Sequence, residues 1–253
     1  MPGDPLTWLT YAGLGVFVGF FSGLLGIGGG AVTVPILGLV FVAFGFPPQH
    51  VMPVAIGTSL AAIVLATASS ARAHLQHEAV RKDIVRGLAP GIVLAGLAAG
   101  MVAKLLPTAH LKGFFLVFVV YITYTIVFGL KPKSTRPVPG RGGLFGVGLL
   151  VGGFSGLAGV GGAMISMPFM MSWGLAFQTA IGTGSAISFV VAIAGVTGFI
   201  AARLGEAALP AWTLGYVYVP AFLGISVTSV FAAPLGARVA HRLPVGHLKK
   251  VFA

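Results

Sequence analysis

The segment that decides the fold reads Phe21-Ser-Gly-Leu-Leu-Gly-Ile-Gly-Gly-Gly30, and it returns as Phe154-Ser-Gly-Leu-Ala-Gly-Val-Gly-Gly-Ala163. Other landmarks recur in the same order: Pro35 with Pro168, Ile56-Gly57-Thr58 with Ile181-Gly182-Thr183, Pro90 with Pro220, and Leu106-Pro107 with Leu243-Pro244. Such internal similarity indicates duplication. We therefore predict a first membrane repeat over residues 1–130 and a second, inverted one over 143–253. Residues 131–142 form a cytoplasmic linker with four basic residues and three prolines.

The composition places most of the chain in lipid. Of its 253 residues, 57% are hydrophobic and 8% are charged, whereas an average soluble domain has about 25% charged residues. This excludes a soluble enzyme, a disordered chain and a nucleic-acid-binding domain. The absence of cysteine excludes disulfides and thiolate metal sites.

Long apolar runs predict nine membrane segments. They cover residues 6–25, 31–46, 51–71, 84–103 and 113–129 in the first repeat, and 143–158, 164–177, 179–202 and 208–233 in the second. The second repeat reaches Ala253 where a fifth segment would begin, so a tenth span is left open. We predict an all-α polytopic membrane protein, an inverted repeat of about five transmembrane segments each, with short helices broken by glycine.

Orientation follows from parity and charge. Each repeat has an odd number of membrane segments, five, so the second copy inserts with the opposite orientation to the first. With the N-terminus outside, 12 of the 15 Lys and Arg residues fall on the cytoplasmic side, and only Lys104, Lys112 and Arg203 fall outside. This distribution agrees with the positive-inside rule, and we expect a multi-pass protein with an external N-terminus.

The glycine clusters predict a binding site for an anion. Glycine runs interrupt helices, and the apolar segments that follow are too short to cross a ~30 Å hydrocarbon core. Short, broken segments at matching places in inverted halves are typical of a transporter's central site. The N–H groups that open the next helix attract anions. The alternative is close helix packing through small residues. The candidate substrate-binding glycines are Gly26, Gly28, Gly29, Gly30, Gly159, Gly161 and Gly162.

Hydroxyl and other polar side chains complete the predicted site. Thr58, Ser59, Thr183 and Ser185 stand near segment starts and can donate hydrogen bonds to an oxyanion; the alternative is bonding to a carbonyl of their own helix. Gln49 and His50, at the outer turn before the third segment, remain candidate substrate contacts. Pro90 and Pro220 each remove a backbone donor and are hinge candidates.

The remaining titratable residues predict no catalytic or metal site. No segment carries a central carboxylate, so the usual proton relay of buried acids is missing. The other five histidines lie near segment ends or in the tail, and we expect them to be loop residues rather than metal ligands: His74, His77, His110, His241 and His247.

The doubled Ser-Gly-Leu-x-Gly-x-Gly-Gly element, each copy followed by a proline, resembles the TauE/SafE sulfite exporter family, also called the toluene sulfonate uptake permease family. The resemblance implies transport of sulfur-containing anions, such as sulfite, sulfonates or sulfoacetate, across a bacterial inner membrane. The family's motif residues correspond here to the glycines of both clusters, to Pro35 and to Pro168. Ala163 stands where the first cluster has its third consecutive glycine.

We therefore expect a secondary transporter for a small sulfur-containing anion that works by alternating access, embedded in membrane lipid, with no enzymatic activity and no cofactor. The alternatives are an anion channel, or a membrane-embedded enzyme or assembly factor of sulfur metabolism. The sequence leaves open which anion is carried and in which direction. It also leaves open whether a proton or sodium ion is coupled, and whether the chain forms a homodimer.

Overall fold

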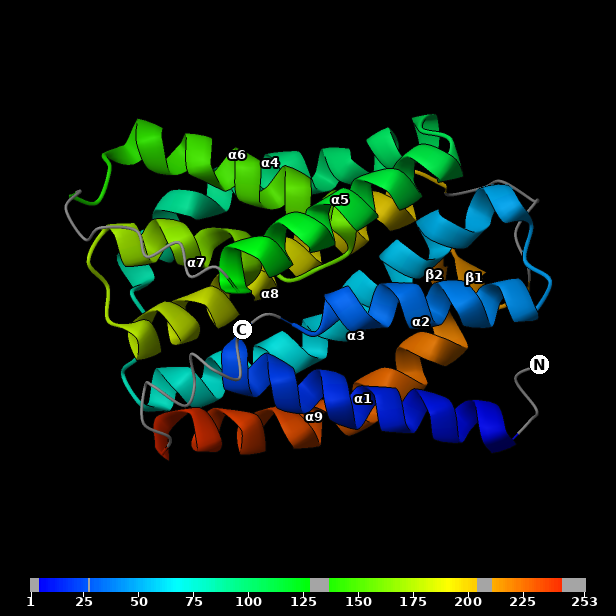
Figure 1. Cartoon of the computed structure of the whole chain (residues 1–253), viewed down its shortest axis with the longest axis horizontal. Helices are drawn as coiled ribbons and strands as arrows, with labels where there is room; N and C mark the ends of the chain where they lie inside the picture. The colour runs from blue at the N-terminus through cyan, green and yellow to red at the C-terminus, as the bar shows by residue number, and fades with distance from the viewer. Residues whose placement is uncertain (1–4, 27, 128–136, 204–210, 243–253) are drawn as a thin grey trace.

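The computed structural model describes residues 5–26, 28–127, 137–203 and 211–242, and it confirms an all-α polytopic architecture (Figure 1). The first half contains α1 (Pro5–Leu25), α2 (Gly30–Ala43), α3 (Pro48–Gln76), α4 (Lys82–Leu105) and α5 (Thr108–Val127). The second contains α6 (Arg141–Ala158), α7 (Ala163–Ser172), α8 (Phe177–Ala201), β1 (Thr213–Leu214), β2 (Val217–Tyr218) and α9 (Val219–Arg242).

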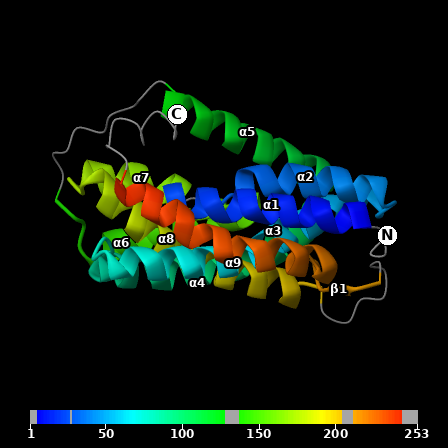
Figure 2. The same ribbon diagram turned by 90° about the horizontal axis from the view of Figure 1, so that it is seen from below.

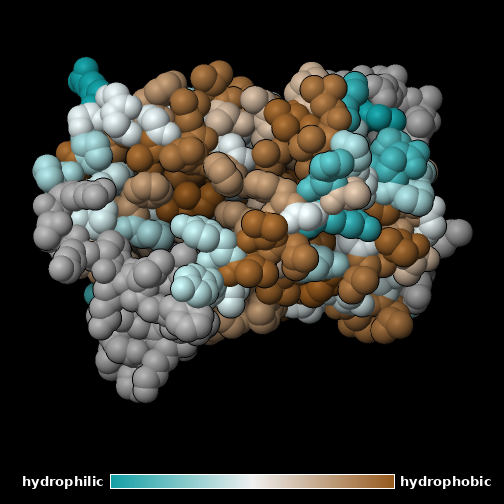
Figure 3. All heavy atoms as spheres, turned by 45° about the horizontal axis from the view of Figure 1, so that its top comes forward, coloured by the Kyte–Doolittle hydropathy of each residue, from teal (hydrophilic) through white to brown (hydrophobic). Residues whose placement is uncertain are grey.

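Six of these helices are long and apolar enough to cross a membrane: α1, α3, α4, α6, α8 and α9. Hydrophobic residues cover most of the middle of the visible surface, and hydrophilic residues gather mainly toward its two ends (Figure 3). The helices that follow the glycine clusters are short. With 14 residues in α2 and 10 in α7, they extend roughly 21 Å and 15 Å, which confirms the expectation of short helices.

The ninth predicted segment, over residues 208–233, is wrong at both ends, because α9 begins at Val219 and continues to Arg242. The apolar stretch before it contains a two-residue hairpin in which Thr213 pairs with Tyr218. Gly215 turns this hairpin at a φ of 55°, and Tyr216, Val217 and Tyr218 are buried. Their hydrophobicity therefore serves the protein core rather than the membrane.

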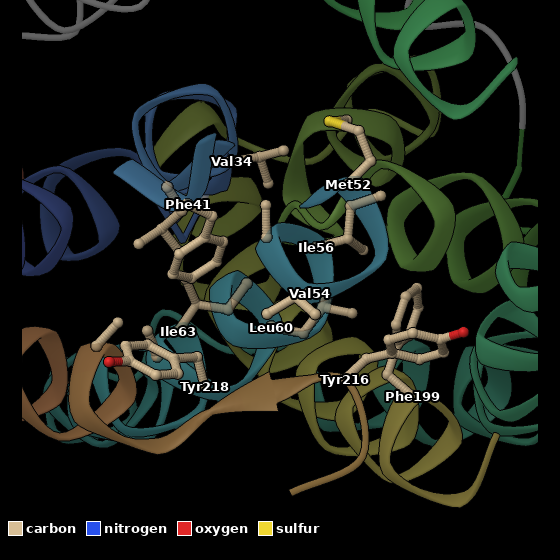
Figure 4. Packing of buried hydrophobic residues seen from close by; sticks show 14 of the residues in the cluster. Val34, Phe41, Met52, Val54, Ile56, Leu60, Ile63, Phe199, Tyr216 and Tyr218 are labelled. Atoms are coloured by element: carbon tan, nitrogen blue, oxygen red, sulfur yellow. The ribbon is translucent and has the colours of Figure 1, made fainter. Parts of the chain in front are cut away.

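The centre of the molecule is built on α3. Ile56, Leu60 and Ile63 of this helix are fully buried. They lie in one cluster with Phe199 of α8 and the hairpin tyrosines (Figure 4). By contrast, α5 lies at the edge of the bundle (Figure 2), with Val117 and Tyr121 exposed. The core therefore combines both halves of the chain around α3 and α8.

Helices from different halves pack in parallel along small residues. On α1, Gly15 meets Ile225, Gly19 meets Ser229 and Gly23 meets Ala233 of α9. The same pattern joins α6 to α4, where Gly148 meets Leu88 and Gly152 meets Ile92. A Cβ at these glycines would collide with the neighbouring backbone, so the close approach requires glycine.

The central helices α3 and α8 run antiparallel, because Gly57 lies beside Phe199 whereas Ser70 bonds to Ser185. Since these helices hold the same place in the two halves, the halves have opposite direction. They also interlock, because α1 packs on α9 and α4 on α6. Residues 131–136 of the predicted linker lie outside the described residues, residues 137–140 are non-helical, and α6 begins at Arg141, within the predicted linker.

These contacts correct the pairing of Pro90 with Pro220. Gly15 and Gly148 correspond in the repeat, and they contact Ile225 and Leu88, respectively. Leu88 is therefore equivalent to Ile225, so Pro90, two residues later, is equivalent to Val227 rather than to Pro220. Pro90 lies inside α4, whereas Pro220 is the second residue of α9. A first-turn N–H has no partner within its helix, so Pro220 removes no helix hydrogen bond there. The physical reason for a hinge therefore applies only to Pro90.

Replacing Gly152 with alanine should lower the thermal unfolding temperature, because the new methyl group would strike the Ile92 carbonyl and separate α6 from α4. Overpacking of this kind costs about 1–3 kcal/mol. The matched control is Gly146→Ala in the same helix, where a Cβ meets nothing within 4 Å. Thermal unfolding of both variants in detergent gives the comparison, and equal stability would contradict this account of the contact.

Candidate functional site

The two glycine turns meet in the middle of the bundle. We define the first turn by Gly26, Gly28, Gly29 and Gly30, and the second by residues 159–163. A Cβ at Gly28 would lie 3.4 Å from the Cα of Gly161, and one at Gly30 would collide with the Gly159 carbonyl. Four of these glycines have positive φ angles, which other residues rarely adopt: Gly26, Gly28, Gly29 and Gly159.

Two serines tie the turns to the central helices. The Ser59 hydroxyl on α3 donates to the Gly159 carbonyl at 2.8 Å. The Ser188 hydroxyl on α8 donates to the Gly26 carbonyl at 2.9 Å and accepts the Ala163 N–H at 3.0 Å. Gly26 and Gly159 are equivalent in the repeat, so each turn is held by a serine from the other half. The sequence did not single out Ser188, although it lies one helical turn after the predicted site residue Ser185.

Four backbone amides in these turns are candidates for anion binding. Within the described part of the chain, no hydrogen bond occupies the N–H groups of Gly28, Gly29, Gly161 or Gly162. They precede the first turns of α2 and α7, where unpaired N–H groups and the helix dipole carry partial positive charge. This is the backbone arrangement in which proteins bind anions.

Ser22 and Ser155 are a second matched pair beside the turns. Both side chains are fully buried, and neither hydroxyl has a hydrogen-bond partner among the residues described. Val18 and Val151, four residues earlier on the same helix faces, contact the positions of Gly29 and Gly162. A buried hydroxyl without a partner costs roughly 1–3 kcal/mol, so each of these two hydroxyls is available to donate a hydrogen bond. Their place inside the repeated motif was the signal that sequence reasoning missed.

The predicted hydroxyls Ser59 and Ser185 donate inside the protein. Ser59 bonds to Gly159, as described above. The Ser185 hydroxyl lies 3.0 Å from that of Ser70, and Ser70 itself lies 3.1 Å from the Ser22 carbonyl. A hydroxyl has one hydrogen to donate, so Ser70 donates to Ser22 and Ser185 donates to Ser70. Both side chains therefore shape the site rather than present a free O–H.

Thr58 and Thr183 are not brought together. The Thr58 hydroxyl accepts the N–H of Tyr218 at 2.9 Å, and the Thr183 hydroxyl accepts that of Arg81 at 3.0 Å. These N–H groups directly precede α9 and α4, so the threonines fasten equivalent connections at opposite ends. The antiparallel register of α3 and α8 separates the two threonines by about 14 helical residues, or roughly 20 Å.

Gln49 and His50 lie away from the glycine turns, at the end of the bundle where α3 begins. Gln49 is exposed, and its carbonyl accepts a hydrogen bond from Thr108 at 2.7 Å. His50 is buried, with its Nε2 3.3 Å from Nη2 of Arg203. The Arg203 guanidinium also lies 5.7 Å from the centre of the Tyr216 ring. Any contact of these residues with an anion would be made near the surface.

The sequence matches the family model described as sulfite exporter TauE/SafE over residues 11–253. The chain belongs to the TauE/SafE family. It is 36% identical to a probable membrane transporter protein of Haemophilus influenzae, over 95% of this chain and 91% of that one. It is 24% identical to another from Methanocaldococcus jannaschii, over 93% and 87%. No solved structure matches the chain.

These likenesses and the six membrane-length helices identify the TauE/SafE protein as a multi-pass membrane transporter. The names of its relatives are those of transporters rather than enzymes. In the part of the chain that the structure describes, no group of three or more metal-ligating side chains is suited to hold a metal ion.

Replacing Ser188 with alanine should destabilise the protein, because the Gly26 carbonyl and the Ala163 N–H would both lose their partner. Each buried group left unpaired costs about 1–3 kcal/mol. Thr197→Val is the control on the same helix, since the Thr197 hydroxyl is exposed and bonds only to Ile193 of its own helix. A Ser188→Ala protein that unfolds at the temperature of the control would show that the tie is not needed.

Proposed function

We propose that this TauE/SafE protein is a secondary transporter for a small sulfur-containing anion, such as an organosulfonate, sulfite or sulfoacetate. The observation that carries the proposal is the pair of mirror-related turns with unpaired amides. Ser22 and Ser155 lie one turn before these glycines, and their buried hydroxyls have no partner within the described residues. The family description supports the sulfur chemistry. Oxyanions of sulfur carry several oxygens, so one group can accept hydrogen bonds from both turns.

Elimination supports this place for the anion. A charge in the hydrocarbon layer needs compensation, since leaving it unpaired costs several kcal/mol or more. Every described Lys and Arg lies outside the helices or within five residues of a helix end. Backbone N–H groups and hydroxyls are therefore the donors left near the middle of the bundle.

The inverted halves support alternating access. Two copies of opposite direction can exchange their packing, which exposes a central site to one side and then to the other. The glycine turns lie against both central helices, with Gly28 near Ile63 of α3 and Gly26 near Ser185 of α8. Pro90, inside α4, is the candidate at which a helix bends.

The charges support an external N-terminus in the inner (plasma) membrane of a bacterium. Seven described basic residues lie at the end where α1, α3 and α9 finish: Arg72, Arg81, Lys82, Arg86, Arg141, Arg238 and Arg242. Lys104, Lys112 and Arg203 lie at the other end. The positive-inside rule places the richer end in the cytoplasm.

Removing the hydroxyl of Ser22 or Ser155 should weaken anion binding about 10- to 100-fold, the loss of one hydrogen bond to a charged group. Folding should be unaffected, because neither hydroxyl has a partner to lose. Calorimetric titration of Ser22→Ala and Ser155→Ala with sulfite, taurine, sulfoacetate and toluene sulfonate measures the change. Ser172→Ala is the control, since that hydroxyl donates to Phe169 at the end of α7.

Normal affinity of both variants for every compound that the parent protein binds would place the anion elsewhere. Larger side chains at Gly29 or Gly162 are a poorer test, because they would press on Val18, or on Val151 and α8. Flux into proteoliposomes separates a transporter from a channel. Saturable counterflow is expected, and flux without competition between substrates would overturn the transporter mechanism.

A further inference from the structure

We propose that His74 and His241 form a proton-binding pair that couples the proposed transport to a proton gradient. The sequence placed both histidines among loop residues, but the structure places both in helices, and His74 is fully buried on α3. His241 lies in the last turn of α9 and is half-buried. The coupling part of the proposal rests on the proposed function, whereas proton binding by the pair does not.

The contacts of His74 define where its hydrogen lies. Its Nε2 is 2.9 Å from the Gly23 carbonyl of α1, and a carbonyl only accepts. Nε2 therefore carries the hydrogen, and Nδ1 is the acceptor of the neutral ring. This Nδ1 is 3.0 Å from Nε2 of His241, so His241 donates to His74. The unprotonated nitrogen of the pair is then Nδ1 of His241.

The pair has room for one added proton. A proton that binds at Nδ1 of His241 makes an imidazolium, and its Nε2–H still donates to His74. A second proton, at Nδ1 of His74, would place two N–H groups opposite each other and break the link. The step forms one N–H bond, adds one positive charge and changes no other bond. The geometry thus gives a one-proton site.

The surroundings provide a route to water. The His77 ring, exposed at the end of α3, lies 4.2 Å from the His241 ring. The other charged groups nearest in the chain are exposed: Arg72 and Glu78 on α3 and its C-terminal turn, and Arg238 and Arg242 on α9. From α1 the pair receives only the Gly23 carbonyl. Protons can therefore reach the pair from the basic end of the bundle.

The same contacts connect the pair to the proposed anion site. His74 holds the Gly23 carbonyl, and Ser70, one turn earlier on α3, holds the carbonyl of Ser22. Gly23 is three residues before Gly26, where the first turn begins. Glu78 and Asp83, the acids of the described part, are exposed. The histidine pair bonds α1, α3 and α9, so its protonation can alter the helix that leads into the turn.

The first experiment measures proton binding without any substrate. Imidazole ¹⁵N resonances of the full-length protein in detergent are followed against pH. We expect His74 and His241 to titrate together and to take up one proton. In His241→Gln, the His74 resonances should move to a different titration midpoint. Independent titration of the two rings, or unchanged His74 behaviour in this variant, would overturn the proposal.

The second experiment measures coupling in proteoliposomes with toluene sulfonate and sulfoacetate. Sulfonates stay ionised over the working pH range, so the effect of pH reports on the protein. A pH gradient should stimulate uptake at least tenfold, and His74→Gln and His241→Gln should abolish this stimulation while substrate exchange persists. The exposed His110→Gln is the control. Two substitutions are used because His74 is buried and its variant can fail to fold.

Full stimulation in a folded variant, or stimulation by a sodium gradient alone, would overturn the coupling. If the parent protein neither binds nor transports either sulfonate, the proposed substrate class fails, and the ¹⁵N titration still decides whether the pair binds a proton. The two proposals are therefore distinguished by separate measurements.

Discussion

The contact between the two glycine turns is the constraint on which the structure depends. Gly30 approaches the Gly159 carbonyl so closely that no Cβ fits between them. The helices are interrupted at both turns, so the peptide N–H and C=O groups there must be kept away from lipid. Each such group left without a hydrogen bond in hydrocarbon costs several kcal/mol. The turns are therefore enclosed by α3 and α8, and serines of these helices bind their carbonyls. The long helices around them keep water and lipid away from the break.

The opposite direction of the halves could be predicted from the sequence because it follows from parity and charge, which need no knowledge of packing. The eight segments before the hairpin could be predicted because each is a continuous apolar run, although only five of them, α1, α3, α4, α6 and α8, are long enough to cross a membrane. The ninth was displaced because the stretch before α9, which includes Tyr216, Val217 and Tyr218, belongs to the core rather than to a membrane segment. Hydrophobicity alone does not separate these two surroundings.

The candidate site was predicted in part. The glycine turns could be located because four of their glycines, Gly26, Gly28, Gly29 and Gly159, adopt conformations that other residues rarely adopt. The roles of the hydroxyls could not, because a serine bonds to whatever lies opposite, and that depends on the register between helices. Thus the hydroxyls of Ser59 and Ser185 bond within the protein, whereas those of Ser22 and Ser155 have no partner within the described residues. His74 was read as a loop residue because α3 extends five residues beyond the predicted segment.

The parallel contact of α1 with α9 has a consequence for biosynthesis. Most of the chain separates the first helix from its main partner. At about 5–20 residues per second, the ribosome finishes α1 roughly 10 to 40 s before α9 begins. During that interval the glycine face of α1 has no permanent neighbour in the bilayer. A helper protein or lipid must cover it, and a nascent chain stopped before α9 would be a substrate for membrane quality control.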